Sequence, residues 1–129
     1  MRIEDFPYQS VLVVCRVNTA RSPMTVGYLQ HLFNMNDIKT KVFSGGISSH
    51  ARDGMLISMD AKLAMKEEGI ELPENYKSID LKKHQELIHD ADLILTLTEK
   101  HKKEISKYID GSKSDVFTLS EFAGENGDI

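Results

Sequence analysis

Ser10-Val-Leu-Val-Val-Cys15 runs directly into Arg16-Val-Asn-Thr-Ala-Arg21-Ser22-Pro23, and this stretch decides the fold. A short, continuous, β-branched apolar run is typical of a strand that is buried on both faces, as in the centre of a parallel sheet. Ser22 is a good helix cap and Pro23 is favoured at the first helical position. The sequence therefore predicts a strand, a tight loop and a helix, with Cys15 at the end of the strand.

Strand and helix patterns alternate along the rest of the chain. A helical stripe of Met24, Tyr28 and Leu32 follows the loop. Further strands are predicted at 40–44, 92–97 and 115–119, and helices at 55–68, 81–89 and 99–109. This alternation predicts a parallel sheet with helices on both faces, whose sites lie beyond the carboxyl ends of the strands, at the switch point of the topology.

The helix predicted over 55–68 has a distinct apolar pattern. Met55, Met59 and Leu63 recur at helical spacing and are expected to share its apolar face. Gly69 is expected to end this helix. The strand at 40–44 is likewise expected to end before two glycines.

Composition limits the classes of protein to which the chain can belong. With 129 residues it fits one domain, residues 1–129. A net charge of -4 argues against a nucleic-acid or anionic-membrane surface. The single cysteine excludes an intramolecular disulfide and a four-thiolate zinc site, and the five histidines lack metal spacing. Without a signal peptide or a membrane-length apolar run, we expect a cytoplasmic protein with no metal and no cofactor.

The loop from Cys15 to Pro23 carries a thiol and a guanidinium at its two ends. Backbone N–H groups of such a loop and the N-terminus of the following helix can surround a tetrahedral anion. The thiolate form of Cys15 would attack phosphorus, and the planar fork of Arg21 could grip two phosphoryl oxygens. The alternative is that Cys15 is an inert core residue and Ser22 only a helix cap.

Four segments of the chain resemble the low-molecular-weight protein phosphatase family. Its signature is Cys, five residues, Arg, Ser and Pro between the first strand and the first helix. The matching segments are VLVVCRVNTARSPM, FSGGIS, DADLILTLTEKHKKEI and DVFTLSEFAGENGDI. The resemblance implies a three-layer, flavodoxin-like α/β fold, with a four-stranded parallel sheet of order 2-1-3-4, helices on both faces and the C-terminal helix missing. It also implies a protein phosphatase that acts through a cysteinyl-phosphate.

By resemblance, Cys15 is the nucleophile, Arg21 holds the transition state, and the Ser22 hydroxyl hydrogen-bonds the thiolate. Asn18 and Ser44 would brace the loop. The implied partner is a phosphorylated protein substrate, with phosphate or other oxyanions as inhibitors. The residues implied in phosphate binding are Arg16, Val17, Asn18, Thr19, Ala20 and Ser22.

Thr19 bears on the substrate. Members that resemble bacterial protein-arginine phosphatases carry threonine at this loop position, whereas phosphotyrosine enzymes tend to carry a bulkier aliphatic residue. The TLSEFAG segment also resembles the arginine-phosphatase branch. Thr19 can equally be a small, tolerated loop residue, so phosphoarginine and phosphotyrosine both stay open.

The chain departs from the family pattern at several positions. Val17 stands where the family has glycine, and a β-branched residue resists the backbone shapes that glycine allows. Arg16 is unusual and could contact an anionic substrate. Ala20 replaces a second cysteine that many relatives carry. The general acid of the family lies in an Asp-Pro motif that this sequence lacks, and the nearest carboxylate, Asp128, is a candidate that better fits an aspartate preceding that motif.

The departures and the shared fold leave other interpretations of the chain open. A sheet face left uncovered by the missing helix would favour aggregation, dimerisation or swapping. Val17 and the absent acid allow a phosphate-binding pseudophosphatase without turnover. Arsenate reductases share the fold and loop but need further cysteines to relay a disulfide. An inert flavodoxin-like domain is the remaining alternative.

Overall fold

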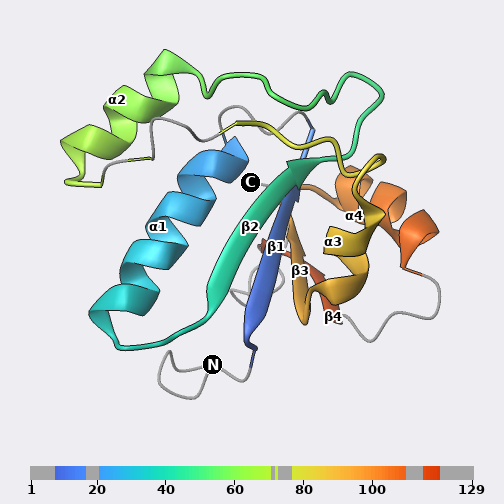
Figure 1. Cartoon of the computed structure of the whole chain (residues 1–129), viewed down its shortest axis with the longest axis horizontal. Helices are drawn as coiled ribbons and strands as arrows, with labels where there is room; N and C mark the ends of the chain where they lie inside the picture. Colours follow the sequence, from blue (N-terminus) through green and yellow to red (C-terminus); the bar gives the residue numbers. More distant parts are fainter. Residues whose placement is uncertain (1–7, 17–20, 71, 73–76, 110–114, 120–129) are drawn as a thin grey trace.

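Four parallel strands form one sheet at the centre of the computed structural model, within the described residues 8–16, 21–70, 72, 77–109 and 115–119 (Figure 1). The strand order is β2-β1-β3-β4, as the resemblance implied. The strands are β1 (Ser10–Cys15), β2 (Lys41–Gly46), β3 (Leu93–Thr96) and β4 (Asp115–Thr118). The predicted α/β class and parallel sheet are therefore confirmed.

The central strand β1 is buried from Val11 to Cys15, as expected for a strand covered on both faces. It pairs with β2 on one side and with β3 on the other. In the first pairing Cys15 lies opposite Gly46, so the carboxyl ends of β1 and β2 coincide.

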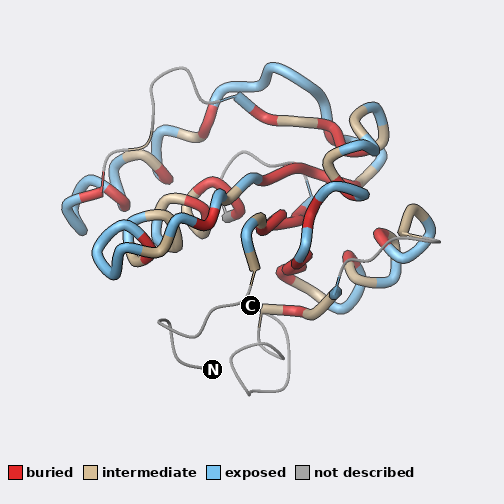
Figure 2. Tube along the Cα trace, turned by 60° about the horizontal axis from the view of Figure 1, so that its bottom comes forward, coloured by how far each residue is buried: buried red, intermediate tan, exposed pale blue. Residues whose placement is uncertain are grey.

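Helices cover both faces of the sheet (Figures 1 and 2). On one face, Val13 and Cys15 pack with Val26 of α1, and α2 lies beside α1. On the other face, Leu12 packs with Ile88 of α3 and Ile105 of α4. The helices are α1 (Arg21–Met35), α2 (Met59–Glu67), α3 (Gln85–Asp90) and α4 (Glu99–Ile105), followed by the 3-10 helix η2 (Ser106–Tyr108).

The predicted apolar face of the helix over 55–68 is wrong. Helix α2 begins only at Met59, because the Ser58 hydroxyl accepts a hydrogen bond from the Ala61 N–H at 3.1 Å and caps it there. Its buried residues are Ala61 and Met65, on a different face from the predicted stripe. Met55, Met59 and Leu63 are all exposed.

Helix α1 differs from the prediction at its start. Its first residue is Arg21, so Ser22 and Pro23, the predicted cap and first helical residue, are its second and third residues. Met24 and Leu32 are half-buried and Tyr28 is 51% exposed, while Val26 and Phe33 are buried. The helix predicted over 99–109 changes from α to 3-10 after Ile105. Elements could thus be placed from the sequence more reliably than their buried faces.

Two glycines have definite backbone roles. Gly69 follows α2 with a φ of +77°, which confirms the predicted helix end. Gly45 does not end its strand but lies inside β2, where a Cβ atom would come within 2.4 Å of Leu81 Cγ. Its missing side chain therefore lets the segment around Leu81 approach the sheet.

Among the described residues, no helix is long and apolar enough to cross a membrane. Nor do these residues bring together three or more His, Cys, Asp or Glu side chains that could hold a metal ion.

Candidate active site

Cys15 is the last residue of β1, at the carboxyl edge of the sheet. β1 pairs with β2, which follows it in the chain, and also with β3, so the chain switches direction across the sheet at this strand. In an open parallel sheet, ligands bind outside the carboxyl ends of the strands at such a point. The position of Cys15 is therefore that of a ligand site.

The Cys15 thiol contacts the hydroxyl of Ser22, with Sγ and Oγ 2.8 Å apart. Cys15 is 4% exposed and Ser22 is fully buried. Ser22 is the second residue of α1, so the contact joins the end of β1 to the first turn of the helix. Because the N-terminus of an α-helix carries a partial positive charge, this end of α1 favours an anion near Cys15.

The remaining predicted loop residues are placed only in part. Arg21 is the first residue of α1, and Arg16 is exposed directly after Cys15. Cys15, at the end of β1, and Arg21, at the start of α1, thus lie at the two ends of this stretch of chain, as predicted. Val17, Asn18, Thr19, Ala20 and the candidate acid Asp128 lie outside the described residues.

Ser44, the predicted loop support, is buried in β2. It lies opposite Val13, two residues before the Gly46 that pairs with Cys15. Since paired residues of parallel strands project to the same face and alternate residues share a face, Ser44 lies on the same face of the sheet as Cys15. This placement is compatible with a supporting role.

The segment that follows β2 also contacts the start of the loop. The Ile47 N–H donates to the Cys15 carbonyl at 3.0 Å, and the Ser48 N–H donates to the Arg16 carbonyl at 3.2 Å. Neither Ile47 nor Ser48 is among the site residues predicted from the sequence. The signal that could have found them is the parallel register, because a strand paired with β1 brings its own following residues beside the residues that follow Cys15.

Comparison with known proteins identifies the family of this arrangement. Residues 10–129 match the family described as low molecular weight phosphotyrosine protein phosphatase. The chain belongs to this family. It is therefore a cysteine-dependent protein phosphatase by membership, and the class of its substrate is a phosphorylated protein.

Individual phosphatases resemble the chain over nearly its whole length. It is 38% identical to a protein-arginine-phosphatase of Geobacillus stearothermophilus, over 95% of this chain and 77% of that protein. It is 31% identical to a low molecular weight protein-tyrosine-phosphatase of Acinetobacter johnsonii, over 92% of this chain and 78% of that protein. A solved structure of the YwlE arginine phosphatase, a cysteine-to-serine mutant with a phosphorylated active site serine, matches with a TM-score of 0.82 and 31% identity, over 92% of this chain and 75% of that chain.

Proposed function

We propose that this phosphatase uses Cys15 as its nucleophile and that phosphoarginine in proteins is its preferred substrate. The observation that carries the nucleophile is the buried 2.8 Å contact between Cys15 Sγ and Ser22 Oγ. A hydroxyl at this distance can donate a hydrogen bond to a thiolate, and hydrogen bonding to the charged form of a group favours that form. The thiolate is the form of cysteine that attacks phosphorus.

The reaction has two steps. In the first, the Cys15 thiolate forms a sulfur–phosphorus bond as the bond from phosphorus to the substrate nitrogen or oxygen breaks, and the leaving group takes a proton. In the second, water attacks the cysteinyl-phosphate, inorganic phosphate departs and the thiolate is restored. The YwlE mutant with a phosphorylated active site serine supports a covalent route of this kind.

Charge in the transition state falls on the oxygens of the transferred group. We assign the Arg21 guanidinium to two of them, together with the backbone N–H groups of residues 16–22 and the N-terminus of α1. Asn18 and Ser44 are assigned to brace the loop. Asp128 is the candidate acid that protonates the leaving group. Phosphate and other tetrahedral oxyanions should then act as competitive inhibitors.

The preference for phosphoarginine rests on likeness to known enzymes. The protein-arginine-phosphatase of Geobacillus stearothermophilus is 38% identical, compared with 31% for the protein-tyrosine-phosphatase of Acinetobacter johnsonii. Thr19 and the TLSEFAG segment agree with the arginine-phosphatase branch. Phosphotyrosine is the second candidate, supported by the family description and by the second of these enzymes.

Two matched peptides would test the substrate. One carries phosphoarginine and the other phosphotyrosine at the same position, and phosphate release is measured with the wild type and with Cys15→Ser. We expect a higher kcat/KM for phosphoarginine and no release by the variant. Faster release from phosphotyrosine would overturn the substrate assignment, and phosphate binding without release from either peptide would favour the pseudophosphatase. Dimerisation stays a prediction, which sedimentation velocity would test.

A further inference from the structure

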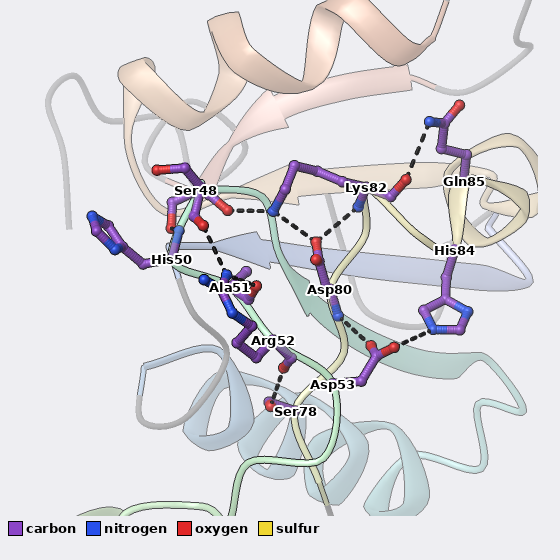
Figure 3. A network of polar contacts seen from close by, with 11 residues as sticks. Ser48, His50, Ala51, Arg52, Asp53, Ser78, Asp80, Lys82, His84 and Gln85 are labelled. Atoms are coloured by element: carbon purple, nitrogen blue, oxygen red, sulfur yellow. Dashed lines mark hydrogen bonds and ion pairs between the residues drawn. The ribbon is translucent and has the colours of Figure 1, made fainter.

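Polar side chains link the segment after β2, residues 48–54, to the segment before α3, residues 78–84 (Figure 3). Lys82 is central to this network. Its ammonium group donates to the Ser48 carbonyl and forms an ion pair with Asp80 Oδ1, with Nζ and Oδ1 2.7 Å apart. The same carboxylate oxygen accepts the Lys82 backbone N–H at 3.1 Å. The position of the lysine head group is thus fixed from two sides.

Asp53 continues the network in the opposite direction. Its Oδ1 accepts the Asp80 backbone N–H at 2.8 Å, and its Oδ2 lies 2.9 Å from His84 Nε2. Ser78 adds a further link, because its hydroxyl donates to the Arg52 carbonyl at 2.6 Å. Residues 48–54 are therefore held against residues 78–84 at both ends, as Figure 3 shows.

This network ends beside the start of the phosphate loop, the proposed phosphate-binding residues 16–22. Ser48 accepts from Lys82 through its carbonyl, and through its N–H it donates to the Arg16 carbonyl at 3.2 Å. A single residue therefore separates the lysine head group from the backbone at which the loop begins. A shift of the Ser48 carbonyl would be transmitted to Arg16.

Burial indicates what the ion pair does for the fold. The Asp80 side chain is 3% exposed and that of Lys82 is 30% exposed. Removing both charges from water costs free energy that largely offsets their attraction, so such pairs contribute little net stability compared with apolar residues. Their hydrogen bonds, however, fix distances and angles. A loop that surrounds a phosphoryl group needs its N–H groups held to within about 0.5 Å.

We propose that Lys82, held in place by Asp80 and Asp53, is a positioning residue of the phosphatase reaction. It fixes the Ser48 carbonyl and, through the Ser48 N–H, the backbone of Arg16 at the start of the loop that is proposed to bind the phosphoryl group. This inference rests on the proposed role of Cys15 and adds residues that do not touch the substrate.

The test compares Lys82→Met with the control Lys83→Met in the full chain. Both remove one positive charge from the same turn, but Lys83 is exposed and acts on the network through its charge near Asp53, whereas Lys82 also holds the Ser48 carbonyl. With an aryl phosphate substrate, we expect kcat to fall about tenfold in Lys82→Met, a loss typical of a modest misplacement of reacting groups. Lys83→Met should keep the wild-type kcat, and Lys82→Arg, which retains a donor, should recover part of the loss.

A second readout does not need turnover. Because Cys15 is the single cysteine of the chain, its alkylation by iodoacetamide reports the state of the loop directly, and bound inorganic phosphate should protect it. We expect Lys82→Met to require about ten times more phosphate for half protection, in line with the loss in kcat. If Lys82→Met fails to fold because Asp80 is left unpaired, Asp80→Asn combined with Lys82→Met replaces it and should show the same weakened protection.

The outcomes separate the two proposals. A wild type without turnover would refute the proposed catalytic function, and phosphate protection of Cys15 would still decide whether Lys82 positions the loop. Equal kcat and equal protection in the two lysine variants would overturn the positioning role. A lower melting temperature of Lys82→Met, with unchanged kcat and unchanged phosphate protection, would also overturn the positioning role.

Discussion

Cys15 Sγ and Ser22 Oγ lie 2.8 Å apart, although six residues separate them in the chain. Both groups are buried, one at the end of β1 and the other in the first turn of α1. The contact places the thiol at the N-terminus of a helix, where a negative charge is favoured. The proposed chemistry of the chain depends on this pairing.

Replacing Ser22 with alanine should lower turnover without unfolding the protein. The change removes the hydroxyl beside Cys15, while alanine remains a good helix former. We expect kcat for an aryl phosphate to fall about a hundredfold, on the scale of losing one preorganised donor. Steady-state kinetics and circular dichroism would measure both effects. An unchanged kcat in Ser22→Ala would show that the hydroxyl serves only the fold.

Ser58→Ala is the matched control, because it removes a serine hydroxyl from the start of another helix. The Ser58 hydroxyl accepts the Ala61 N–H at 3.1 Å and caps α2. Losing this cap should reduce the free energy of unfolding by about 1 kcal/mol, as measured by urea denaturation, and leave kcat unchanged. A fall in kcat as large as that of Ser22→Ala would mean that turnover simply follows stability.

Gly45→Ala should destabilise the sheet beside the site. A Cβ atom at this position would lie 2.4 Å from Leu81 Cγ and 2.5 Å from Leu81 Cδ2, and Leu81 is fully buried. Since the leucine cannot turn away into solvent, we expect a loss of about 1–3 kcal/mol in urea denaturation.

A double-mutant cycle would identify the cause of that loss. In Gly45→Ala combined with Leu81→Ala the clash is absent, so the double variant should be more stable than the sum of the two single changes predicts. Strictly additive losses would show that glycine is needed at position 45 for its backbone rather than for the close approach of Leu81.

The ion pair between His84 and Asp53 predicts a pH dependence of stability. The hydrogen bond to Asp53 raises the pKa of His84 above its ordinary 6.5, and hydrogen bonds from the Asp80 backbone and from His84 lower the pKa of Asp53 below 3.8. The contribution of His84 to the free energy of unfolding is fully present below pH 6.5 and is lost as the pH rises through the raised pKa of His84. The contribution of Asp53 to the free energy of unfolding is present above pH 3.8 and is lost as the pH falls through the lowered pKa of Asp53.

The stability difference between the wild type and His84→Asn should therefore be largest between pH 3.8 and 6.5 and should shrink above pH 6.5. Urea denaturation at a series of pH values would measure it. Because both groups are exposed, salt should weaken the difference. A difference that grows between pH 6.5 and 8 would contradict the assigned direction of the shift.

Local sequence patterns were sufficient for the central part of the fold. The buried run from Val11 to Cys15 predicted the central strand, which is confirmed. Ser22 and Pro23 predicted a helix after the loop, and this helix begins two residues before Pro23, at Arg21. The predicted apolar face of α2 was wrong, because the Ser58 cap leaves Met55 outside the helix and the helix buries Ala61 and Met65 instead. Leu56 instead forms an isolated bridge with Lys77, a contact that no helical spacing reveals.

The contacts of the site also divide into those that local sequence patterns could predict and those that they could not. Cys15 and Ser22 could be paired in advance because they flank one short loop that the family signature describes. Ser48 and Lys82 could not, because their contact joins segments 34 residues apart. Backbone hydrogen bonds of Gly46 with Ile79 and Leu81, and the approach of Leu81 to Gly45, bring those segments together, and no local sequence pattern predicts them.

Trapping the covalent intermediate would test whether Cys15 is the nucleophile. The wild-type chain is mixed with an aryl phosphate, quenched within the first turnover and digested, and the peptide that contains Cys15 is weighed by mass spectrometry. We expect this peptide to gain the mass of one phosphoryl group, with a burst of aryl alcohol equal to the enzyme concentration. Continued turnover by Cys15→Ala, with no phosphorylated Cys15 peptide in the wild type, would contradict it.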